Sequence, residues 1–354
     1  MARHVLPYTS FVRFALAAFL LMIPGGASLA ARKDSILMKN GDHLTGEVKR
    51  LENGILYIDL NYVSGSIGLD WSQVDRMEST GVYQITLQDG THLVGTLQKV
   101  QIDKAAEKNV AINAESRLLQ VPASEVVDVE SQQRNFWRQL RGNVSLGASY
   151  TSGNSQTALN SDDNVNYRAK LWAAGASYTS SFSGQSGSSE TNLQEVQAAG
   201  ERYFGRNSFV FALSDFLHSS QQQLNLRTTL GGAYGEYWVR TNEHTLRWFG
   251  GIVYTHEDFQ SGSSQPTQQN VEGLVGAQYE LFYFDRYALQ SQLLLFPGLS
   301  DFGRIRATTK STLRVKLRNN FSLSFSVWDN YDSRPPVTAK KNELGVSTNV
   351  GWTF

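Results

Sequence analysis

The sequence predicts an all-β protein: a transmembrane antiparallel β-barrel of about twelve strands, preceded by a duplicated small β module. Three observations indicate this fold class. The last thirteen residues alternate between two kinds of side chain, the N-terminus has the features of an export signal, and residues 34–131 contain an internal repeat. Each of these observations predicts a separate part of the chain.

The closing segment, residues 342–354, has one mainly apolar face. The alternate positions are Leu344, Val346, Thr348, Val350, Trp352 and Phe354, with glycines and small polar residues between them. Such a strand suits a wall between lipid and a polar interior. The aromatic end, Trp352 and Phe354, resembles the signal that the bacterial barrel-assembly machinery reads, so this machinery is an expected partner. The alternative is the edge strand of a β-sandwich.

The N-terminus reads as a cleaved signal peptide spanning residues 1–30. Arg3 and Arg13 precede an uncharged run over 14–23, and a small-x-small site follows at 28–30. The run is too short for a membrane-spanning helix, which needs roughly 20 apolar residues. We therefore expect an exported mature chain that begins near Ala31, and we expect any membrane crossing to use strands.

Composition excludes several classes of function. The chain has no cysteine, which excludes disulfides, thiolate nucleophiles and cysteine metal sites. Its 32 basic and 32 acidic residues balance, and removal of Arg3 and Arg13 leaves an excess of two acidic residues, so nothing points to nucleic acid. Thirty glycines, 15 tyrosines and 18 phenylalanines accompany a negative mean hydropathy, as expected for alternating barrel strands.

The repeat predicts a duplicated module over residues 31–131. Residues 40–46 (Asn-Gly-Asp-His-Leu-Thr-Gly) match residues 89–95 (Asp-Gly-Thr-His-Leu-Val-Gly), and the copies end alike at 74–79 and 126–131. Asn-Gly and Asp-Gly dipeptides favour tight hairpin turns. The two copies resemble SH3-like folds, as small antiparallel barrels or sheets. The expected role of this module is to bind a periplasmic protein or peptidoglycan.

Two further features of the N-terminal region bear on ligands. His43 and His92 occupy equivalent positions, so a shared metal site is conceivable, but no second histidine or carboxylate recurs at ligand spacing. We expect ordinary strand positions there, and no metal or cofactor. Residues 132–141 read as a linker, and Phe136 and Trp137 suit a membrane interface.

From residue 142 the chain divides into about twelve alternating segments, and an even number of strands returns both ends of a bacterial barrel to one side. The expected strands are 142–151, 157–169, 171–183, 191–203, 207–218, 224–238, 244–257, 268–282, 286–297, 302–317, 320–331 and 342–354. Short connections alternate with longer ones, as at periplasmic and external faces. Beside the short turns we expect an aromatic girdle: Trp172, Tyr203, Phe204, Tyr237, Trp238, Trp248, Tyr283, Phe284 and Tyr287.

The segment 302–317 separates its two faces most clearly. The apolar face consists of Ile305, Ala307, Leu313, Val315 and Leu317, and the basic face consists of Arg304, Arg306, Lys310, Arg314 and Lys316. Charges at the bilayer midplane cost several kcal/mol each, so the basic face should line the lumen. The same alternation points Glu272 and Glu280 inward, so acidic and basic side chains share one lumen. Asp163 and Glu236 fall on the outer face without explanation.

Two functions compete for such a lumen. The opposed charges can neutralise one another and fill a narrow barrel, or the basic face can line a narrow channel for small anionic solutes. A rival from another class is an outer-membrane hydrolase of the phospholipase type. His218 and His256 are its only weak candidates, and its strand motifs are absent, so we expect no catalytic residues and no enzyme activity.

The barrel segment also resembles a known family. Gly147–Tyr150 and the turn Thr151–Ser155 open it, and Trp352–Phe354 closes it after tyrosine-rich strands. This pattern resembles the salt-induced outer-membrane proteins, a family of unknown function, over residues 143–354. The resemblance implies the outer membrane of a Gram-negative bacterium, with lipid bilayer and lipopolysaccharide as surroundings, and a link to osmotic conditions. It implies no catalytic residues.

Overall fold

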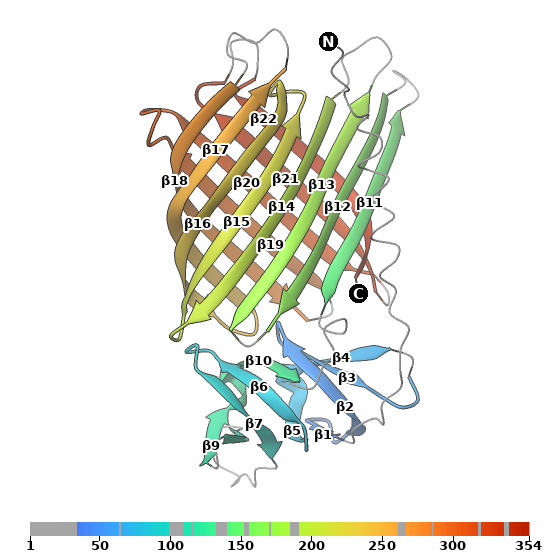
Figure 1. Ribbon diagram of the computed structural model, residues 1–354. Helices are drawn as coiled ribbons and strands as arrows, with labels where there is room; N and C mark the ends of the chain where they lie inside the picture. Colours follow the sequence, from blue (N-terminus) through green and yellow to red (C-terminus); the bar gives the residue numbers. More distant parts are fainter. Residues whose placement is uncertain are drawn as a thin grey trace, which may run out of the picture. The chain divides into compact units, whose positions relative to one another are not determined.

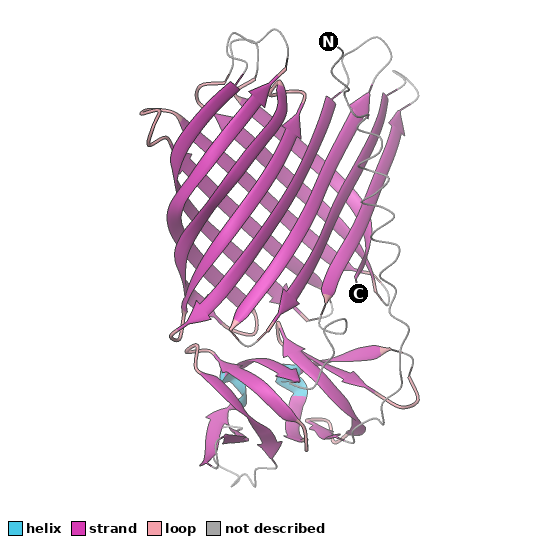
Figure 2. Ribbon diagram, in the orientation of Figure 1, coloured by secondary structure: helices cyan, strands magenta, loops and turns pink. Residues whose placement is uncertain are grey.

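The computed structural model of the chain describes residues 34–63, 65–98, 109–114, 117–131, 140–151, 156–169, 171–184, 191–260, 267–284, 286–317, 320–335 and 340–353. The expected signal peptide, most of the expected linker, residues Ser152–Ser155 of the first barrel turn and the terminal Phe354 lie outside these residues. Strands dominate the structure (Figure 2), and two 3-10 helices, η1 (Trp71–Gln73) and η2 (Ala123–Glu125), interrupt them. Within the described ranges, no helix has the length and apolar character needed to span a bilayer.

The N-terminal module is a ten-stranded antiparallel sheet. Its strands are β1 (Asp34–Met38), β2 (His43–Glu52), β3 (Ile55–Asp59), β4 (Ser66–Asp70), β5 (Val74–Glu78), β6 (Val82–Leu87), β7 (His92–Gln98), β8 (Asn109–Ala114), β9 (Arg117–Pro122) and β10 (Val126–Ser131). In each copy the first strand pairs with the second and the fifth: β1 with β2 and β5, and β6 with β7 and β10. The two copies therefore have the same pattern of strand pairing.

Equivalent turns and a common core relate the two copies further. Gly41 and Gly90 both have positive φ, at 92° and 81°, at matching hairpin turns. One cluster of buried side chains includes Ile36 and Leu51 of the first copy with Ile85 of the second. Strand β10 also pairs with β2 of the first copy. The two copies therefore share one hydrophobic core.

A buried carboxylate ties the first strand of the module to its neighbours. Asp34 is fully buried and accepts hydrogen bonds from the backbone N–H of Val48 (2.8 Å), the Tyr83 hydroxyl (3.1 Å) and the Ser79 hydroxyl. Asp34 and Tyr83 are equivalent residues of the two copies, each at the start of its first strand. These bonds satisfy a polar group whose burial would otherwise be costly.

The remaining twelve strands form a closed antiparallel barrel, as the sequence predicted (Figure 1). They are β11 (Arg141–Thr151), β12 (Gln156–Arg168), β13 (Trp172–Gly184), β14 (Thr191–Phe204), β15 (Ser208–Ser219), β16 (Leu224–Arg240), β17 (His244–Phe259), β18 (Thr267–Tyr283), β19 (Tyr287–Pro297), β20 (Ile305–Lys316), β21 (Phe321–Asp332) and β22 (Asn342–Thr353). Each strand pairs with the next, and β11 pairs with β22 through residues 143–146 and 350–353. This pairing closes the cylinder.

Alternation of side chains explains why these segments form a barrel wall. In β22 the residues Leu344, Val346 and Val350 point outward and are 66%, 70% and 52% exposed, while Glu343 and Asn349 between them are buried. The same period separates Phe325 and Val327 from Ser324 and Ser326 in β21. Because side chains alternate between the faces of a strand, the wall has an apolar outside and a polar inside.

The connections differ in length at the two ends of the barrel. At one end, which we call the tight-turn end, β14 and β15 are joined by residues 205–207 and β16 and β17 by 241–243. At the other end, which we call the loop end, residues 260–266 and 333–341 join strands. The first residue of β11 and the last of β22 lie at the tight-turn end.

The aromatic girdle differs from the prediction at two positions. Trp238, Tyr283 and Trp172 point outward near the tight turns, with exposures of 69%, 50% and 47%. Tyr203 and Tyr237 instead point into the barrel, where they pack against Phe209. Tyr203 lies two residues after the inward Glu201 and therefore shares its face, and β16 shifts register just after Tyr237. Counting aromatic residues near turns could not reveal which face each one takes.

Candidate functional site: the barrel lumen

The five basic residues predicted for the lumen occupy different environments. Arg304 lies just before β20, because this strand begins at Ile305 and not at residue 302 as expected, and the other four lie on β20. Arg304 and Arg306 are 2% and 5% exposed and lie near the loop end. Lys310 and Arg314 are half-buried further along the strand, and Lys316 is exposed at its last residue. Their neighbours Ile305 and Leu313 point outward. The two arginines nearest the loop end are therefore sequestered from solvent.

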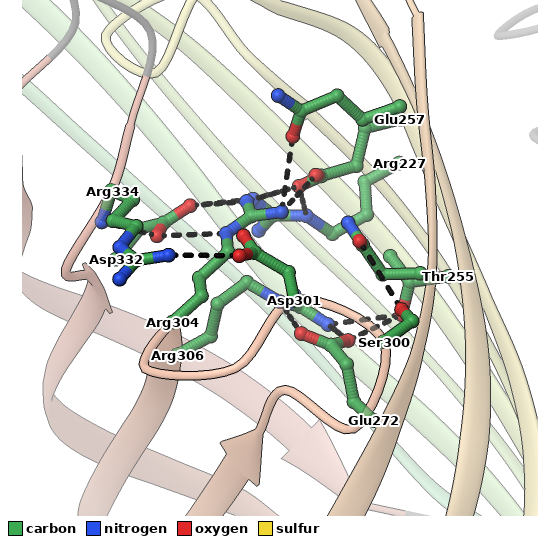
Figure 3. A network of polar contacts seen from close by, with 12 residues as sticks. Arg227, Thr255, Glu257, Glu272, Ser300, Asp301, Arg304, Arg306, Asp332 and Arg334 are labelled. Atoms are coloured by element: carbon green, nitrogen blue, oxygen red, sulfur yellow. Dashed lines mark hydrogen bonds and ion pairs between the residues drawn. The ribbon is translucent and has the colours of Figure 1, made fainter.

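Arg304 is the centre of a buried ion network near the loop end (Figure 3). Its guanidinium lies between two carboxylates, with Nη1 2.7 Å from Glu257 Oε2 and Nε 3.1 Å from Asp332 Oδ1. Nη2 donates to both carboxylates as well. Glu257 lies on β17 and Asp332 on β21, so one side chain links strands that are four positions apart in the barrel order.

Two further arginines complete the network. Arg227 Nε donates to Glu257 Oε1 at 2.8 Å, and Arg306 Nε donates to Glu272 Oε1 at 2.8 Å. The Thr255 hydroxyl joins the second pair, since it donates to Glu272 at 2.6 Å and accepts from Arg306 at 3.1 Å. The network thus pairs three guanidinium groups, of residues 227, 304 and 306, with the three carboxylates of residues 257, 272 and 332. Pairing of this kind offsets the high cost of burying charge.

Direct side-chain contacts cross the lumen near the loop end. Ser219 at the end of β15 donates to Glu343 Oε2 on β22 at 2.6 Å. These strands are five positions apart in a ring of twelve, which places them on nearly opposite walls. Arg227 on β16 similarly comes within 3.9 Å of Asp332 on β21. These contacts narrow the lumen at this level.

A second set of contacts crosses the lumen at mid-depth. Lys310 Nζ on β20 lies 2.9 Å from Asp162 Oδ2 on β12 and 3.1 Å from Thr179 Oγ1 on β13. Trp328 on β21 packs against the Leu193 cluster from the far wall. Between these groups lies a cavity of about 20 Å³ lined by Thr179, Leu193, Glu195, Thr308, Lys310, Trp328 and Asn330. A space of this size holds about one water molecule.

The two sides of the lumen differ in character. Strands β14 to β19 carry an inward apolar cluster in which Phe211 and Phe249 meet edge to face, with centroids 4.9 Å apart. Arg306 lies over the Phe296 ring of this cluster, 4.8 Å from its centroid. The wall formed by β21, β22 and β11 instead carries the small buried polar residues Asn143, Ser145, Ser322, Ser324, Ser326 and Asn349.

The apolar cluster is a lumen feature that sequence reasoning missed. Phe249 lies two residues after Arg247 on β17 and so shares its inward face, and that signal was available in the sequence. Large apolar side chains in a barrel strand usually indicate the lipid side, so its size favours the wrong face for this phenylalanine. The cluster occupies space that water would fill in an open pore.

The acidic residues predicted for the lumen both point inward. Glu272 is 1% exposed and belongs to the buried network. Glu280 lies toward the tight-turn end, where it accepts hydrogen bonds from Gln278 at 2.8 Å and Gln290 at 3.3 Å. Nearby, Arg247 Nη1 lies 2.6 Å from Glu201 Oε1. The structure thus separates the two glutamates into different levels of the lumen.

The two outward carboxylates now have an explanation. Asp163 accepts hydrogen bonds from the Ser145 backbone N–H at 3.0 Å and the Ser161 hydroxyl at 2.7 Å, so it occupies a position where β11 and β12 exchange fewer backbone bonds. Glu236 lies near the tight-turn end and accepts from the Tyr234 hydroxyl. Both groups are hydrogen-bonded, which lowers the cost of their outward placement.

The histidines considered for catalysis or metal binding do not gather with other reactive groups. His218 Nδ1 lies 2.9 Å from the carbonyl oxygen of Asn225. His256 alternates with the inward Glu257 and so takes the other face of β17. His43 begins β2, and His92 contacts the Thr86 hydroxyl at 3.1 Å. No three histidine, aspartate or glutamate side chains lie together at metal-binding spacing in the described part of the chain.

The fold and its interior define the class of protein: a closed twelve-stranded antiparallel barrel with an apolar outer face and buried ion pairs in its lumen. The chain belongs to the family described as "Protein of unknown function, DUF481", whose model matches residues 144–354. This match covers the whole barrel except the first three residues of β11.

Several solved structures resemble the chain weakly. The translocator domain of the autotransporter NalP from Neisseria meningitidis has a TM-score of 0.38 and 14% identity, over 63% of this chain and 90% of that one. The NanC porin has a TM-score of 0.37 and 12% identity, over 61% and 98%. The beta domain of the Bordetella autotransporter BrkA has 0.30 and 9%, over 61% and 98%. No curated protein matches the sequence.

Proposed function

We propose that the chain is an outer-membrane β-barrel protein of a Gram-negative bacterium whose lumen is sealed at rest and whose barrel anchors the duplicated module in the periplasm. The main support for this proposal is that side chains meet across the lumen at two depths. Ser219 contacts Glu343 near the loop end, and Lys310 contacts Asp162 at mid-depth. A general pore needs a continuous water-filled lumen. The structural role, rather than free passage of solutes, fits these contacts.

The outer wall supports the membrane location. Leu146, Ile252, Val275 and Val346 are each more than half exposed on the outside of the barrel. Contiguous apolar surface of this extent is rare on a protein surrounded by water. In a bilayer the same side chains contact hydrocarbon, while all backbone groups of a closed barrel remain paired within the wall. The export signal expected at residues 1–30 and the aromatic end of β22 agree with this location.

The buried network supports a seal that is stable rather than transient. Separating Arg304 from Glu257 and Asp332 would leave charged groups partly unpaired in the interior, which is strongly unfavourable. Neutral pairing also leaves little net charge at the loop end to attract ions. Both effects oppose spontaneous opening.

A second candidate function is a narrow channel for small anionic solutes along the polar wall. Two cations favour it. The Lys310 side chain retains 30% of its exposure beside the cavity. Arg314 Nε has no hydrogen-bond acceptor among the described residues, although it is buried. Cations placed in sequence along one wall would favour anions if the cross-lumen contacts separated.

Other parts of the proposal rest on the sequence. The duplicated module would bind a periplasmic protein or peptidoglycan, and the barrel would be inserted by the barrel-assembly machinery among lipid and lipopolysaccharide. The resemblance to salt-induced outer-membrane proteins adds a response to osmotic conditions. We propose that the chain is not an enzyme. Phospholipid hydrolysis that disappears with His218→Ala or His256→Ala would reverse this last point.

Planar-bilayer recording of the purified full-length protein tests the seal. The wild type should give no steady conductance, whereas the double variant Arg304→Ala, Lys310→Ala should conduct because both levels of cross-lumen pairing are weakened. The variant Lys341→Ala removes an exposed cation near the loop end and should remain silent. Steady anion-selective current through the wild type, abolished by Lys310→Glu, would instead support the channel. A mature chain that stays dissolved without detergent would refute membrane insertion.

A further inference from the structure

The tight-turn end of the lumen carries an excess of positive charge. The inward cations there are Arg141, Arg168, Arg240, Arg247, Arg314 and Lys316, and the inward acids are Glu201 and Glu280. Of the described residues at this level, six are therefore cationic and two anionic. Arg247 is held by Glu201 and Gln278. The excess thus falls mainly on the arginines at the rim, which are Arg141, Arg168 and Arg240.

Contacts within the barrel hold two of these rim arginines in place. The Arg240 guanidinium lies 3.8 Å from the centroid of the Tyr237 ring, and that of Arg168 lies 5.4 Å from the Tyr203 ring. Cation–π contacts orient a guanidinium without neutralising it. Arg141 lies directly opposite Asn166 on β12. Asn166 precedes Arg168 by two residues, so Arg141, Asn166 and Arg168 all share the inward face of the wall. The two inward tyrosines therefore support a basic rim.

The duplicated module has a complementary acidic face. Asp128 on β10 lies directly opposite Glu52 on β2, and Glu130 follows two residues later on the same face. Their neighbours Leu51 and Val129 are fully buried in the core, so the carboxylates take the opposite face. Like charges directly opposite in a sheet are unfavourable, which favours a cationic partner for them. Arg50 of β2 lies on the same face, 3.4 Å from Glu52.

The connection between the module and the barrel limits how far these two faces can separate. The acidic strand β10 ends at Ser131, and the barrel begins at Arg141, so nine residues connect them. Nine residues span at most about 32 Å when fully extended. A tether of this length maintains a high effective concentration of one part beside the other. The module of the same chain is consequently the partner that reaches the basic rim most readily.

We propose that the module docks its acidic face, formed by Glu52, Asp128 and Glu130, onto the basic rim of the barrel. Docking covers the tight-turn end of the lumen with a folded domain and lets the rim arginines compensate the opposed carboxylates. Because the docking joins surfaces of opposite charge, it weakens as salt rises. This inference concerns the relation between the parts of the chain and stands apart from whether the lumen conducts.

Cysteine crosslinking of the full-length protein in lipid nanodiscs tests the docking, and the cysteine-free sequence leaves no background reaction. One cysteine replaces Gln84, which lies opposite Glu130 on the acidic face, and the other replaces the inward Asn166 near the rim. A matched control places the first cysteine at Asp42, in an exposed turn of the module. A short flexible bismaleimide should crosslink the first pair at least about fivefold more than the control pair.

Charge reversal separates specific docking from simple proximity. Arg168→Glu in the 84/166 background should lower the crosslinking rate about fivefold, since a handful of cooperating surface ion pairs is affected. Adding Asp128→Arg should restore the rate, and 0.5 M sodium chloride should lower it in the parent. Equal crosslinking of the test and control pairs, or no response to Arg168→Glu, would overturn the docking. A gel shift that depends on heating confirms that each variant contains a folded barrel, so failure here is distinguishable from failure of membrane insertion.

Discussion

Arg304 offers the most direct test of the buried network. The variant Arg304→Met retains an unbranched side chain of similar length and removes the guanidinium from between Glu257 and Asp332. After this change Glu257 keeps Arg227, with Nε at 2.8 Å and Nη2 at 2.7 Å. Asp332 keeps the Arg334 backbone N–H at 2.9 Å, and its nearest remaining cation is Arg227 at 3.9 Å. The cost of the substitution therefore falls mainly on Asp332.

The expected magnitude follows from the number of bonds and their burial. Arg304 donates two hydrogen bonds to each of two buried carboxylates. Bonds to charged groups are worth about 1.5–3 kcal/mol each, but the desolvation of the arginine, which the variant avoids, offsets part of the sum. Breaking a buried pair by removing one partner typically costs about 3–5 kcal/mol. We expect Arg304→Met to lower the free energy of unfolding by this amount.

Arg334 provides a matched control in the same region (Figure 3). Its Nη1 lies 2.8 Å from Asp301, but the two side chains are 55% and 39% exposed. Exposed pairs contribute about 0–1 kcal/mol, so Arg334→Met should lower stability by no more than this. Urea unfolding of the barrel in phospholipid vesicles, followed by tryptophan fluorescence, measures both variants. Equal losses for Arg304→Met and Arg334→Met would refute the assignment of the seal to the buried network.

The remaining predictions concern the module and the barrel wall. Asp34→Ala leaves the donors of Val48, Ser79 and Tyr83 without their acceptor and should destabilise the module by about 3 kcal/mol. Hydrogen exchange of the backbone amides of Ile36 and Ile85 should then become faster. The control variant Asp42→Ala, at an exposed position, should change these exchange rates little. Gly345→Ala would place its Cβ 2.0 Å from the Trp328 ring and should cost about 1–3 kcal/mol in the urea assay. Gly200→Ala, which has open space around its Cβ, should stay within about 0.5 kcal/mol, and the reverse order would contradict the described packing.

The local pattern of the sequence was sufficient to predict the faces of most strands. Along β20 and the residue before it, the alternation of Ile305 and Leu313 with Arg304 and Arg306 indicated the outer and inner sides, because burying unpaired arginine in lipid is costly. The repeat around Gly41 and Gly90 likewise indicated a duplicated module, because its turn chemistry recurs. These features depend on residues close together in the chain.

The contacts across the lumen could not be predicted in the same way. The contact between Ser219 and Glu343 joins residues 124 positions apart, and it depends on how far each strand is staggered against the next. Stagger accumulates around the cylinder, so a small error in each boundary moves opposite walls out of register. The inward positions of Tyr203 and Tyr237 were missed for a related reason, since their aromatic character indicates a membrane interface equally well.

The common core of the duplicated module restricts how the module can be divided. Its last strand, β10, pairs with β2 of the first copy as well as with β6 of the second. A truncation that ends before Val126 therefore removes a strand from both copies at once and exposes the edge of β2 together with Leu51. Neither copy is therefore a complete unit without the other, and an insertion that separates the copies would disrupt both of them.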